Sequence, residues 1–186
     1  MGYYAGIYSA PNRLGLKDWQ LVHRSPERGV IIYPTRDNTQ LRVAIYFACD
    51  NPDPAPGDEA AQRILFKQHC EGLGGPFPIA LAELDSADDL YASALAQVHM
   101  DCWWHGRVVL TGDAAFCPSP LTGQGTSLGL VGAYVLAHEL ARSREVGPSL
   151  TRYEQRMRGF VEINQGIDLS TGEGTDVAKN AIDLQM

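Results

Sequence analysis

The chain has 186 residues, of which 20% are charged and 45% hydrophobic, and its formal net charge is −7. This composition is close to ordinary soluble usage and the length is enough to bury a core, whereas the acidic balance, with no stripe of Lys and Arg, argues against a nucleic-acid partner. No run is apolar enough to span a membrane and the N-terminus lacks the features of a signal peptide, so we expect no membrane partner and a cytoplasmic location.

Four segments of the first fifty residues predict an antiparallel meander, because they are rich in Tyr, Val, Ile and Trp and are separated by turn residues. The segments are residues 3–9, 19–24, 29–33 and 41–49. Along the last one, an apolar set alternates with a mixed set: Leu41, Val43, Ile45 and Phe47 against Arg42, Ala44 and Tyr46. Two interpretations of the mixed face remain open, the wall of an aromatic-substrate pocket and a surface that meets water.

The middle of the chain predicts a stiff linker, two helices and a strand. Prolines and a glycine at residues 51–57 indicate the linker, and Asp58 is placed to cap a helix over 59–71 that Gly72 ends. Pro76 and Pro78 start a short helix that continues to Leu84. Residues 91–100 predict a further strand.

The segment 106–140 carries the clearest chemical signal. A β-branched run at Val108 and Val109 predicts a strand that ends at Gly112 and Asp113, and a loop rich in Gly and Pro follows. Thr126 or Ser127 is placed to cap a helix that runs to about residue 140. A carboxylate at a strand's carboxyl end, beside a helix N-terminus, suits a ligand with hydroxyls and an electron-rich edge.

This segment resembles the second FAD-binding motif of the p-hydroxybenzoate-hydroxylase-like (class A) flavoprotein monooxygenases, roughly G-D-A-A-H-x-x-x-P-x-x-G-x-G. The matching positions are Gly112, Asp113, Ala114, Ala115, Pro120, Gly123 and Gly125. Phe116 stands where the family often has His. The alternative interpretation of the same residues is an ordinary strand-to-helix crossover with a glycine-rich turn.

The resemblance implies that the cofactor is FAD, that Asp113 binds its ribityl chain, and that the backbone around 121–125 approaches the pyrimidine side of the isoalloxazine ring. The implied cofactor-binding set is Gly112, Asp113, Pro120, Leu121, Gly123, Gln124, Gly125 and Thr126. Family chemistry implies reduction of FAD by NADPH or NADH, addition of O₂ at flavin C4a, and hydroxylation by the resulting hydroperoxide. No catalytic side chain is required.

The family's pyrophosphate-binding G-x-G-x-x-G is absent, since Gly123, Gly125 and Gly129 have the wrong spacing for it. The chain therefore resembles the C-terminal portion of such an enzyme, without the N-terminal Rossmann half. We expect an α+β fold with three parts. Residues 1–98 form a mixed or antiparallel substrate-binding sheet with covering helices, 99–165 form the C-terminal strand–loop–helix part of a Rossmann-like FAD-binding domain, and 166–186 form a polar tail interpreted as mobile.

The helix after the motif has almost no polar face between Leu128 and His138, which is typical of a helix buried on several sides. Alone, it would expose a large apolar surface, and such surfaces mark partners. We therefore expect a complementing N-terminal FAD-domain polypeptide or self-association. A further amphipathic helix is predicted over 150–164, and the basic residues from Arg142 to Arg158 are interpreted as solvated helix faces.

Candidate substrate-binding residues are Tyr4, Tyr8, His23, Arg24 and Tyr46 on the sheet, with Phe116 and Pro118 on the motif loop. A tyrosine in a sheet more often packs in the core than contacts a ligand. His23 and Arg24 point to opposite faces of the sheet because they are adjacent on a strand. The expected substrate is a small aromatic or polyketide-like molecule.

Metal chemistry is not predicted. The four cysteines have no C-x-x-C spacing and are expected to be unpaired thiols in a reducing cytosol, and the histidines lack spacings such as H-E-x-x-H. Besides the monooxygenase, two alternatives remain: a truncated, non-catalytic substrate-binding or interaction module, and a related flavin-dependent dehydrogenase or halogenase. Bound flavin in a defined assembly would favour the first, a stable flavin-free monomer the second, and a halide-dependent product the third.

Overall fold

A computed structural model describes residues 1–49 and 57–166 of the chain. It has an α+β fold, as predicted, and the chain divides into two compact units, Met1–Leu95 and a second unit that begins at Ala96. The division lies close to the boundary predicted after residue 98. The predicted linker, apart from Gly57, and the predicted tail beyond Gly166 lie outside the described residues.

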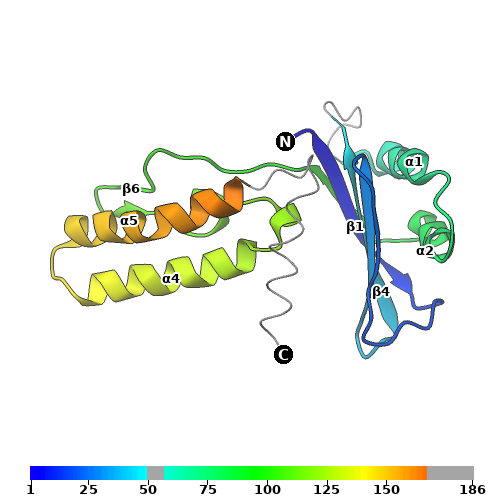
Figure 1. The fold of residues 1–186 in the computed structure, drawn as a ribbon, viewed down its shortest axis with the longest axis horizontal. Coiled ribbons are helices and arrows are strands. Elements are labelled where there is room, and N and C mark those ends of the chain that lie inside the picture. The colour runs from blue at the N-terminus through cyan, green and yellow to red at the C-terminus, as the bar shows by residue number, and fades with distance from the viewer. Residues whose placement is uncertain (50–56, 167–186) are drawn as a thin grey trace. The chain divides into compact units, whose positions relative to one another are not determined.

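The first unit contains a five-stranded antiparallel sheet with the strand order β2-β3-β4-β1-β5 (Figure 1). The strands are β1 (Tyr3–Pro11), β2 (Leu21–Arg24), β3 (Arg28–Thr35), β4 (Gln40–Ala48) and β5 (Tyr91–Ala94). All four strands of the predicted meander are confirmed. The strand predicted from residue 19 begins at Leu21, and the one predicted over 91–100 ends at Ala94.

One face of this sheet is covered by α1 (Glu59–Cys70), α2 (Phe77–Leu81) and the 3₁₀ turn η1 (Ala82–Asp85) (Figure 1). The predicted cap of α1 is confirmed, because the Asp58 carboxylate accepts a hydrogen bond from the Ala61 amide. The apolar set of β4 points to this face and is buried: Leu41, Val43, Ile45 and Phe47. Gly6 lets α1 approach β1, since a Cβ at this position would lie 2.4 Å from the ring of Phe66. The opposite face of the sheet is called the open face below.

The second unit begins with a short hairpin and ends with two long helices. Its elements are β6 (Trp104–His105), β7 (Val108–Val109), α3 (Asp113–Phe116), the 3₁₀ turn η2 (Pro120–Thr122), α4 (Gly125–Ala141) and α5 (Val146–Gln165). Their core contains Trp103, Phe116, Tyr153 and Met157. The helix predicted from residue 150 begins four residues earlier, at Val146.

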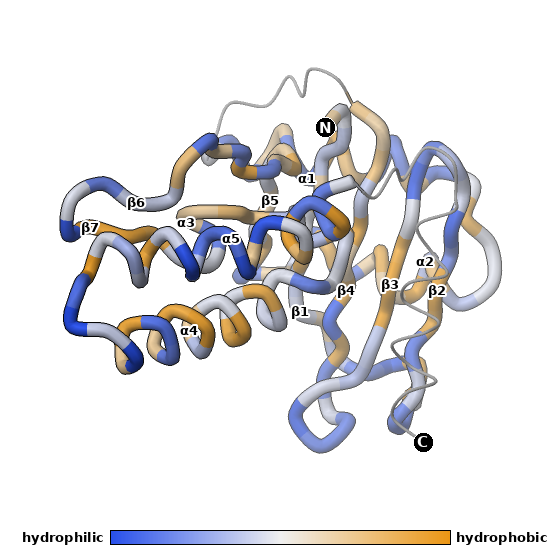
Figure 2. The backbone as a smooth tube through the Cα atoms, turned by 60° about the vertical axis from the view of Figure 1, so that its left-hand side comes forward, coloured by the Kyte–Doolittle hydropathy of each residue, from blue (hydrophilic) through white to orange (hydrophobic). Residues whose placement is uncertain are grey.

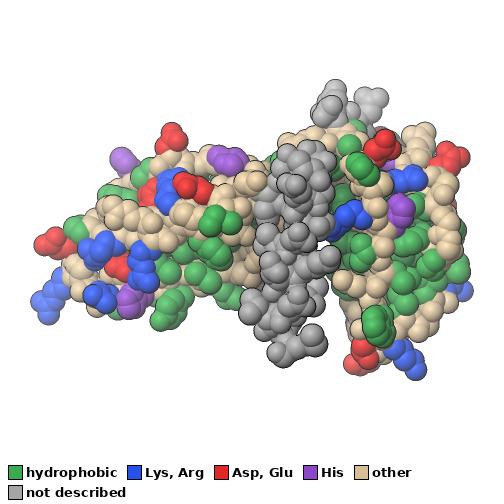
Figure 3. Space-filling view, viewed as in Figure 1, with side chains coloured by type: hydrophobic (Ala, Val, Ile, Leu, Met, Phe, Trp, Pro, Cys, Tyr) green, Lys and Arg blue, Asp and Glu red, His purple; other side chains and the backbone are tan. Residues whose placement is uncertain are grey.

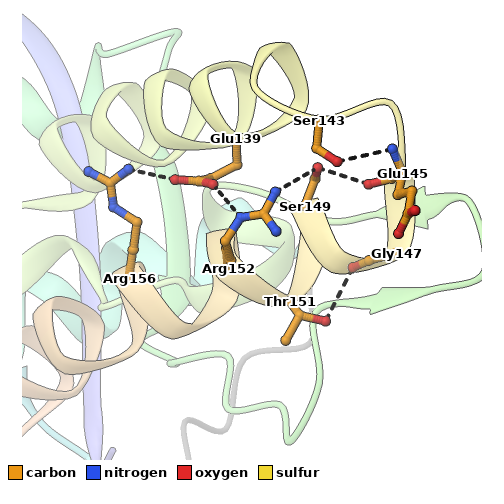
Figure 4. A network of polar contacts seen from close by, with 8 residues as sticks. All are labelled: Glu139, Ser143, Glu145, Gly147, Ser149, Thr151, Arg152 and Arg156. Atoms are coloured by element: carbon orange, nitrogen blue, oxygen red, sulfur yellow. Dashed lines mark hydrogen bonds and ion pairs between the residues drawn. The ribbon is translucent and has the colours of Figure 1, made fainter.

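A buried carboxylate joins α4 to α5 (Figure 4). Glu139 on α4 is 4% exposed and accepts hydrogen bonds at 2.7 Å from Arg152 Nε and at 2.7 Å from Arg156 Nη1, both on α5. The hydrogen bonds from Arg152 and Arg156 lower the pKa of Glu139 from its usual 4.5 to about 2. The two arginines remain solvated, as the sequence predicted, with side chains 42% and 50% exposed, and the structure adds that both guanidinium groups are paired with this carboxylate.

Candidate functional site at the Gly112–Thr126 corner

The chain turns sharply where Gly112 precedes Asp113. Gly112 has φ 61° and ψ −143°, a conformation that a side chain would strain, and its carbonyl accepts hydrogen bonds from the amides of Ala115 and Phe116. Strand β7 ends at Val109, earlier than predicted, and Asp113 is the first residue of α3, where a loop was predicted. The turn leaves Asp113 exposed to solvent.

The loop between α3 and α4 is held by its own hydrogen bonds. Ser119 is 1% exposed and has φ 77°, and its carbonyl accepts hydrogen bonds from the amide and the hydroxyl of Thr122 at 3.2 and 3.0 Å. The Thr122 hydroxyl in turn accepts one from the Gln124 amide at 3.2 Å. Gly123 is in the left-handed region with φ 65°. A loop fixed in this way gives α4 a defined starting point.

The N-terminus of α4 has no side-chain cap. Gln124 occupies the capping position without a side-chain hydrogen bond, so the prediction of Thr126 or Ser127 as the cap is wrong: both lie inside the first turn. Among the described residues, no acceptor lies at the amides of Gly125, Thr126 and Ser127. The Asp113 carboxylate is close by, with Oδ1 3.7 Å from where a Cβ of Gly125 would be. Three orphan amides and one exposed carboxylate therefore share this corner.

Glycines hold α4 against the turn. A Cβ at Gly112 would lie 3.8 Å from Cα of Gly129, and one at Gly132 would lie 3.0 Å from the ring of Phe116 and 3.1 Å from Oγ1 of Thr111. Gly125, Gly129 and Gly132 follow helical spacing and lie on one side of α4. Of the helical glycines, Gly132 serves close packing, whereas a Cβ at Gly129 would meet nothing within 4 Å.

Four candidate substrate residues lie in a hydrophobic core or pack against one: Tyr4, Tyr8, His23 and Phe116. Tyr4 and Tyr8 point to the helix-covered face of the sheet, where they are 4% and 0% exposed. The Tyr8 hydroxyl donates to the Ala80 carbonyl at 3.1 Å, and burial raises the pKa of Tyr8 well above its usual value. His23 packs against the Phe77 ring at 5.7 Å between centroids. Phe116 is 1% exposed and packs on Trp103.

Pro118 is also buried in its own unit, and its carbonyl accepts a hydrogen bond from Gln97 at 3.2 Å. Tyr4, Tyr8, Phe116 and Pro118 are buried, and His23 is half-buried against Phe77. The burial of Tyr4, Tyr8, Phe116 and Pro118 argues against their assignment to the substrate. Of the seven candidates, Arg24 and Tyr46 lie on the open face of the sheet.

The open face also carries a polar cluster that the sequence did not reveal. Asp89 accepts hydrogen bonds at 2.7 Å from the amide and from the hydroxyl of Ser9, and another at 2.7 Å from Arg42. Partial burial works to raise the pKa of Asp89, but the hydrogen bonds from Ser9 and the Arg42 charge outweigh it and lower that pKa. Ser9 and Arg42 are 80 and 47 positions from Asp89 in the chain, so no sequence spacing signals the cluster.

Comparison with known proteins decides the family. The model of the FAD binding domain family matches residues 10–162. A flavin-dependent monooxygenase from an unknown prokaryotic organism is 34% identical over 173 residues, which cover 93% of this chain and 45% of the relative. The chain belongs to the FAD binding domain family. It spans less than half the length of this relative, and the partial coverage fits the C-terminal portion of a class A monooxygenase.

Solved structures of other proteins share the fold. The crystal structure of the tetracycline destructase Tet(55) superposes with a TM-score of 0.82 at 32% identity and covers 97% of this chain, which matches 51% of that protein. Klebsiella pneumoniae HpxO, solved in complex with FAD and uric acid, superposes with a TM-score of 0.67 over 96% of this chain and 49% of its own. Its identity is 18%, so this likeness concerns the fold alone.

The residues of the corner fit FAD as the cofactor of this family. Hydroxyl groups of a ribityl chain are donors for an exposed carboxylate such as Asp113, and orphan amides at Gly125, Thr126 and Ser127 are donors for carbonyl oxygens and ring nitrogens of a flavin. A Cβ at Gly123 would meet nothing within 4 Å, so no atom of the described residues closes the approach there. No helix in the described part of the chain is long and apolar enough to cross a membrane.

Proposed function

We propose that this chain is a working part of an FAD-dependent monooxygenase that uses NADPH or NADH and O₂ to oxygenate an aromatic or polyketide-like molecule. The observation that carries the proposal is the uncapped N-terminus of α4 beside the exposed Asp113 carboxylate, found in a chain of the FAD binding domain family. The names of the relatives support the reaction class.

In this proposal the Asp113 carboxylate would accept hydrogen bonds from the ribityl hydroxyls and so help to hold the cofactor. The amides of Gly125, Thr126 and Ser127 donate to the pyrimidine edge, where the positive end of the α4 dipole favours electron density. The bound flavin would supply the redox chemistry, taking a hydride from the nicotinamide and reacting with O₂. The remaining cofactor-binding candidates are Gly112, Pro120, Leu121, Gly123 and Gln124, which shape the turn and loop.

A complementing FAD-domain polypeptide, or a second copy of the chain, is proposed to cover α4. Leu130 and Tyr134 are 70% and 71% exposed on this helix, and Val131 is 41% exposed. Hydrophobic side chains gather along α4 in the space-filling view (Figure 3), and Figure 2 shows the hydrophobic stretches of the same helix. Apolar surface of this extent is typical of an interface.

A titration of the ¹⁵N-labelled 186-residue chain with FAD tests the cofactor site. We expect weak binding, because the pyrophosphate-binding motif is not in this sequence, with amide shift changes concentrated at Gly125, Thr126 and Ser127. Asp113→Ala should weaken binding by about tenfold or more, the effect of losing hydrogen bonds to a charged group.

Asp101→Ala is the matched control, because Asp101 is an exposed carboxylate of the same unit. It should leave the FAD affinity unchanged. Equal losses in the two variants, or shift changes that avoid the N-terminus of α4, would contradict the proposed site.

A chimera tests the activity. The remaining portion of the 34% identical monooxygenase is joined to this chain, and the product is assayed for bound FAD and for O₂ uptake with NADPH and NADH. We expect a yellow protein that consumes O₂ with at least one nicotinamide. A chimera that retains FAD but consumes no O₂ with either nicotinamide would favour the non-catalytic module, and a halide-dependent product would favour the halogenase.

A further inference from the structure

At the start of the second unit, the chain passes beside the loop that joins α3 to α4, residues 117–124, called the cofactor loop below. The Val98 amide donates a hydrogen bond to the Cys117 carbonyl at 3.1 Å. The Cys117 thiol lies 3.9 Å from the Ala96 carbonyl. Residues 96–98 form no strand with the loop, so a small number of contacts joins the two segments.

Two glutamine side chains bridge this contact. The Gln165 carboxamide, in the last turn of α5, donates hydrogen bonds to the Cys117 carbonyl at 3.2 Å and to the Val98 carbonyl at 2.7 Å. The Gln97 carboxamide donates to the Pro118 carbonyl at 3.2 Å and to the Gln165 carbonyl at 3.0 Å. A carboxamide nitrogen has two N–H groups, so the donors of both side chains are fully used. The side chains of Gln97 and Gln165 are called the glutamine clasp below.

The cofactor loop has few backbone donors of its own at this end. Pro118 and Pro120 have no N–H, so Ser119 supplies the one amide of residues 118–120. Ser119 is also in the left-handed region at φ 77°, a conformation that a non-glycine residue keeps where its surroundings hold it. The clasp holds the carbonyls of Cys117 and Pro118, immediately before Ser119. It therefore fixes the loop at the point where the loop has least means to fix itself.

Other residues of α5 hold the segment that follows Val98. Arg158 donates a hydrogen bond to the Met100 carbonyl at 2.8 Å, and its guanidinium carbon lies 4.5 Å from the centroid of the Trp103 ring. The Glu154 carboxylate accepts a hydrogen bond from the Trp103 amide at 3.3 Å. The helix that carries Gln165 is thus fixed by contacts outside the cofactor loop.

We propose that Gln97 and Gln165 are positioning residues for the cofactor. Neither belongs to the residues proposed to contact the flavin, and both act through the carbonyls of Cys117 and Pro118. The hydrogen bonds within the cofactor loop connect these two positions to the first turn of α4, whose free amides then keep one orientation. This inference rests on the proposed function, because it concerns the FAD site of that enzyme.

Gln97→Glu and Gln165→Glu test the clasp in the 186-residue chain. Each keeps the size of the side chain and replaces the donating NH₂ group by an oxygen, which repels the carbonyls. Gln155→Glu is the matched control, since it adds the same charge at an exposed position of α5. Without FAD, the amides of Thr122 and Gly123 should exchange with solvent about fivefold faster in both clasp variants than in the control, the factor for about one net hydrogen bond.

The same variants are then titrated with FAD. We expect the dissociation constant to rise about fivefold in Gln97→Glu and Gln165→Glu relative to Gln155→Glu. The amide shifts of Gly125 and Thr126, extrapolated to saturation with FAD, should also differ from those of the control, because a displaced loop turns these amides away from the flavin. A side chain that only stabilises the fold would lower the denaturant midpoint and leave the shifts at saturation unchanged.

Gln165→Met separates the loss of hydrogen bonds from repulsion of the anionic FAD, because it removes both donors without adding a charge. Gln155→Met is its control, and the same rise in the dissociation constant is expected. Gln97→Glu changes a different carbonyl contact, so it stays informative if the variants of Gln165 do not fold.

Equal FAD affinity in the clasp variants and their controls would overturn the proposal, and so would unchanged shifts at saturation. A parent chain that binds no FAD would instead reject the proposed function. In that case the exchange rates of Thr122 and Gly123 decide separately whether the clasp holds the loop, since they are measured without FAD.

Discussion

At the scale of single residues, the burial of Glu139 depends on its two arginines. A buried carboxylate without a partner is costly, so the ion pairs at 2.7 Å are what allow Glu139 to sit between α4 and α5 at 4% exposure (Figure 4). Arg152 also donates to the Ser149 hydroxyl at 3.2 Å, which orients its guanidinium. The charge of Glu139 therefore contributes to the stability of the helix pair.

This contribution has a defined pH dependence. The pKa of Glu139 in the folded chain is about 2, below its usual 4.5, so the folded state binds the proton less readily than the unfolded state. The stabilisation is complete above pH 4.5 and is lost as the pH falls from 4.5 toward about 2. Glu139→Gln should lower the denaturant midpoint at pH 7, and the difference from the parent chain should shrink at pH 3.

Glu162→Gln is the control for this measurement, because Glu162 is exposed on α5 and takes part in no ion pair among the described residues. Its midpoint should follow the parent chain at both pH values. If the difference in denaturant midpoint between Glu139→Gln and the parent stays constant from pH 7 to pH 3, the charge of Glu139 is not what stabilises the helix pair.

At the scale of elements, glycines lower the helix propensity of α4, and at Gly132 the missing side chain permits close packing. Glycine in a helix interior costs about 1 kcal/mol relative to alanine, so a helix with several glycines needs another source of stability. Here the absence of a side chain at Gly132 lets α4 pack onto Phe116 and Thr111. The position of Asp113 relative to the first turn of α4 depends on this packing.

Alanine substitutions in the two long helices separate packing from propensity. Gly132→Ala should lower the free energy of unfolding by about 1 kcal/mol, because overpacking against the buried Phe116 ring outweighs the gain in propensity. Gly159→Ala in α5 should raise it by about 0.5–1 kcal/mol, since a Cβ there meets nothing within 4 Å. Denaturant unfolding of both variants checks the signs, and stabilisation by Gly132→Ala would contradict the packing role.

At the scale of the whole molecule, α4 leaves large apolar side chains exposed, among them Leu130, Val131 and Tyr134. The exposed apolar residues of α4 belong to the same helix whose N-terminus is proposed to face the flavin. The relatives are about twice as long as this chain, so additional polypeptide is available in their case to cover the equivalent helix. We expect the 186-residue chain to self-associate through α4 when no such polypeptide is present.

Sedimentation velocity over a range of concentrations tests this expectation. Leu130→Lys should shift self-association to higher concentration, because the charge would have to be buried in the contact. Val108→Lys is the control: Val108 is 68% exposed but lies on the β6–β7 hairpin, outside α4. A parent chain that remains monomeric at high concentration, or equal effects of the two substitutions, would show that α4 is not the contact surface.

The sequence by itself determined the local elements and the cofactor motif, because both depend on residues that are close along the chain. Alternation predicts β4, Asp58 and Gly72 mark the ends of α1, and the matched positions from Gly112 to Gly125 predict the turn, the loop and the following helix. Two details differ: the helix α3 begins at Asp113 where a loop was predicted, and Gln124, not Thr126 or Ser127, precedes α4.

Only the tertiary structure decided which face each side chain occupies and which charges are paired. Tyr4 and Tyr46 look alike in sequence, but the register pairs Tyr4 with Phe47 on the helix-covered face and Tyr46 with Gly29 on the open face. The partners of Glu139 and Asp89 come from other elements and follow no local spacing. The burial of a side chain and the pairing of its charge depend on how the elements pack. Packing brings together residues that are far apart in the sequence, so no local pattern predicts these contacts.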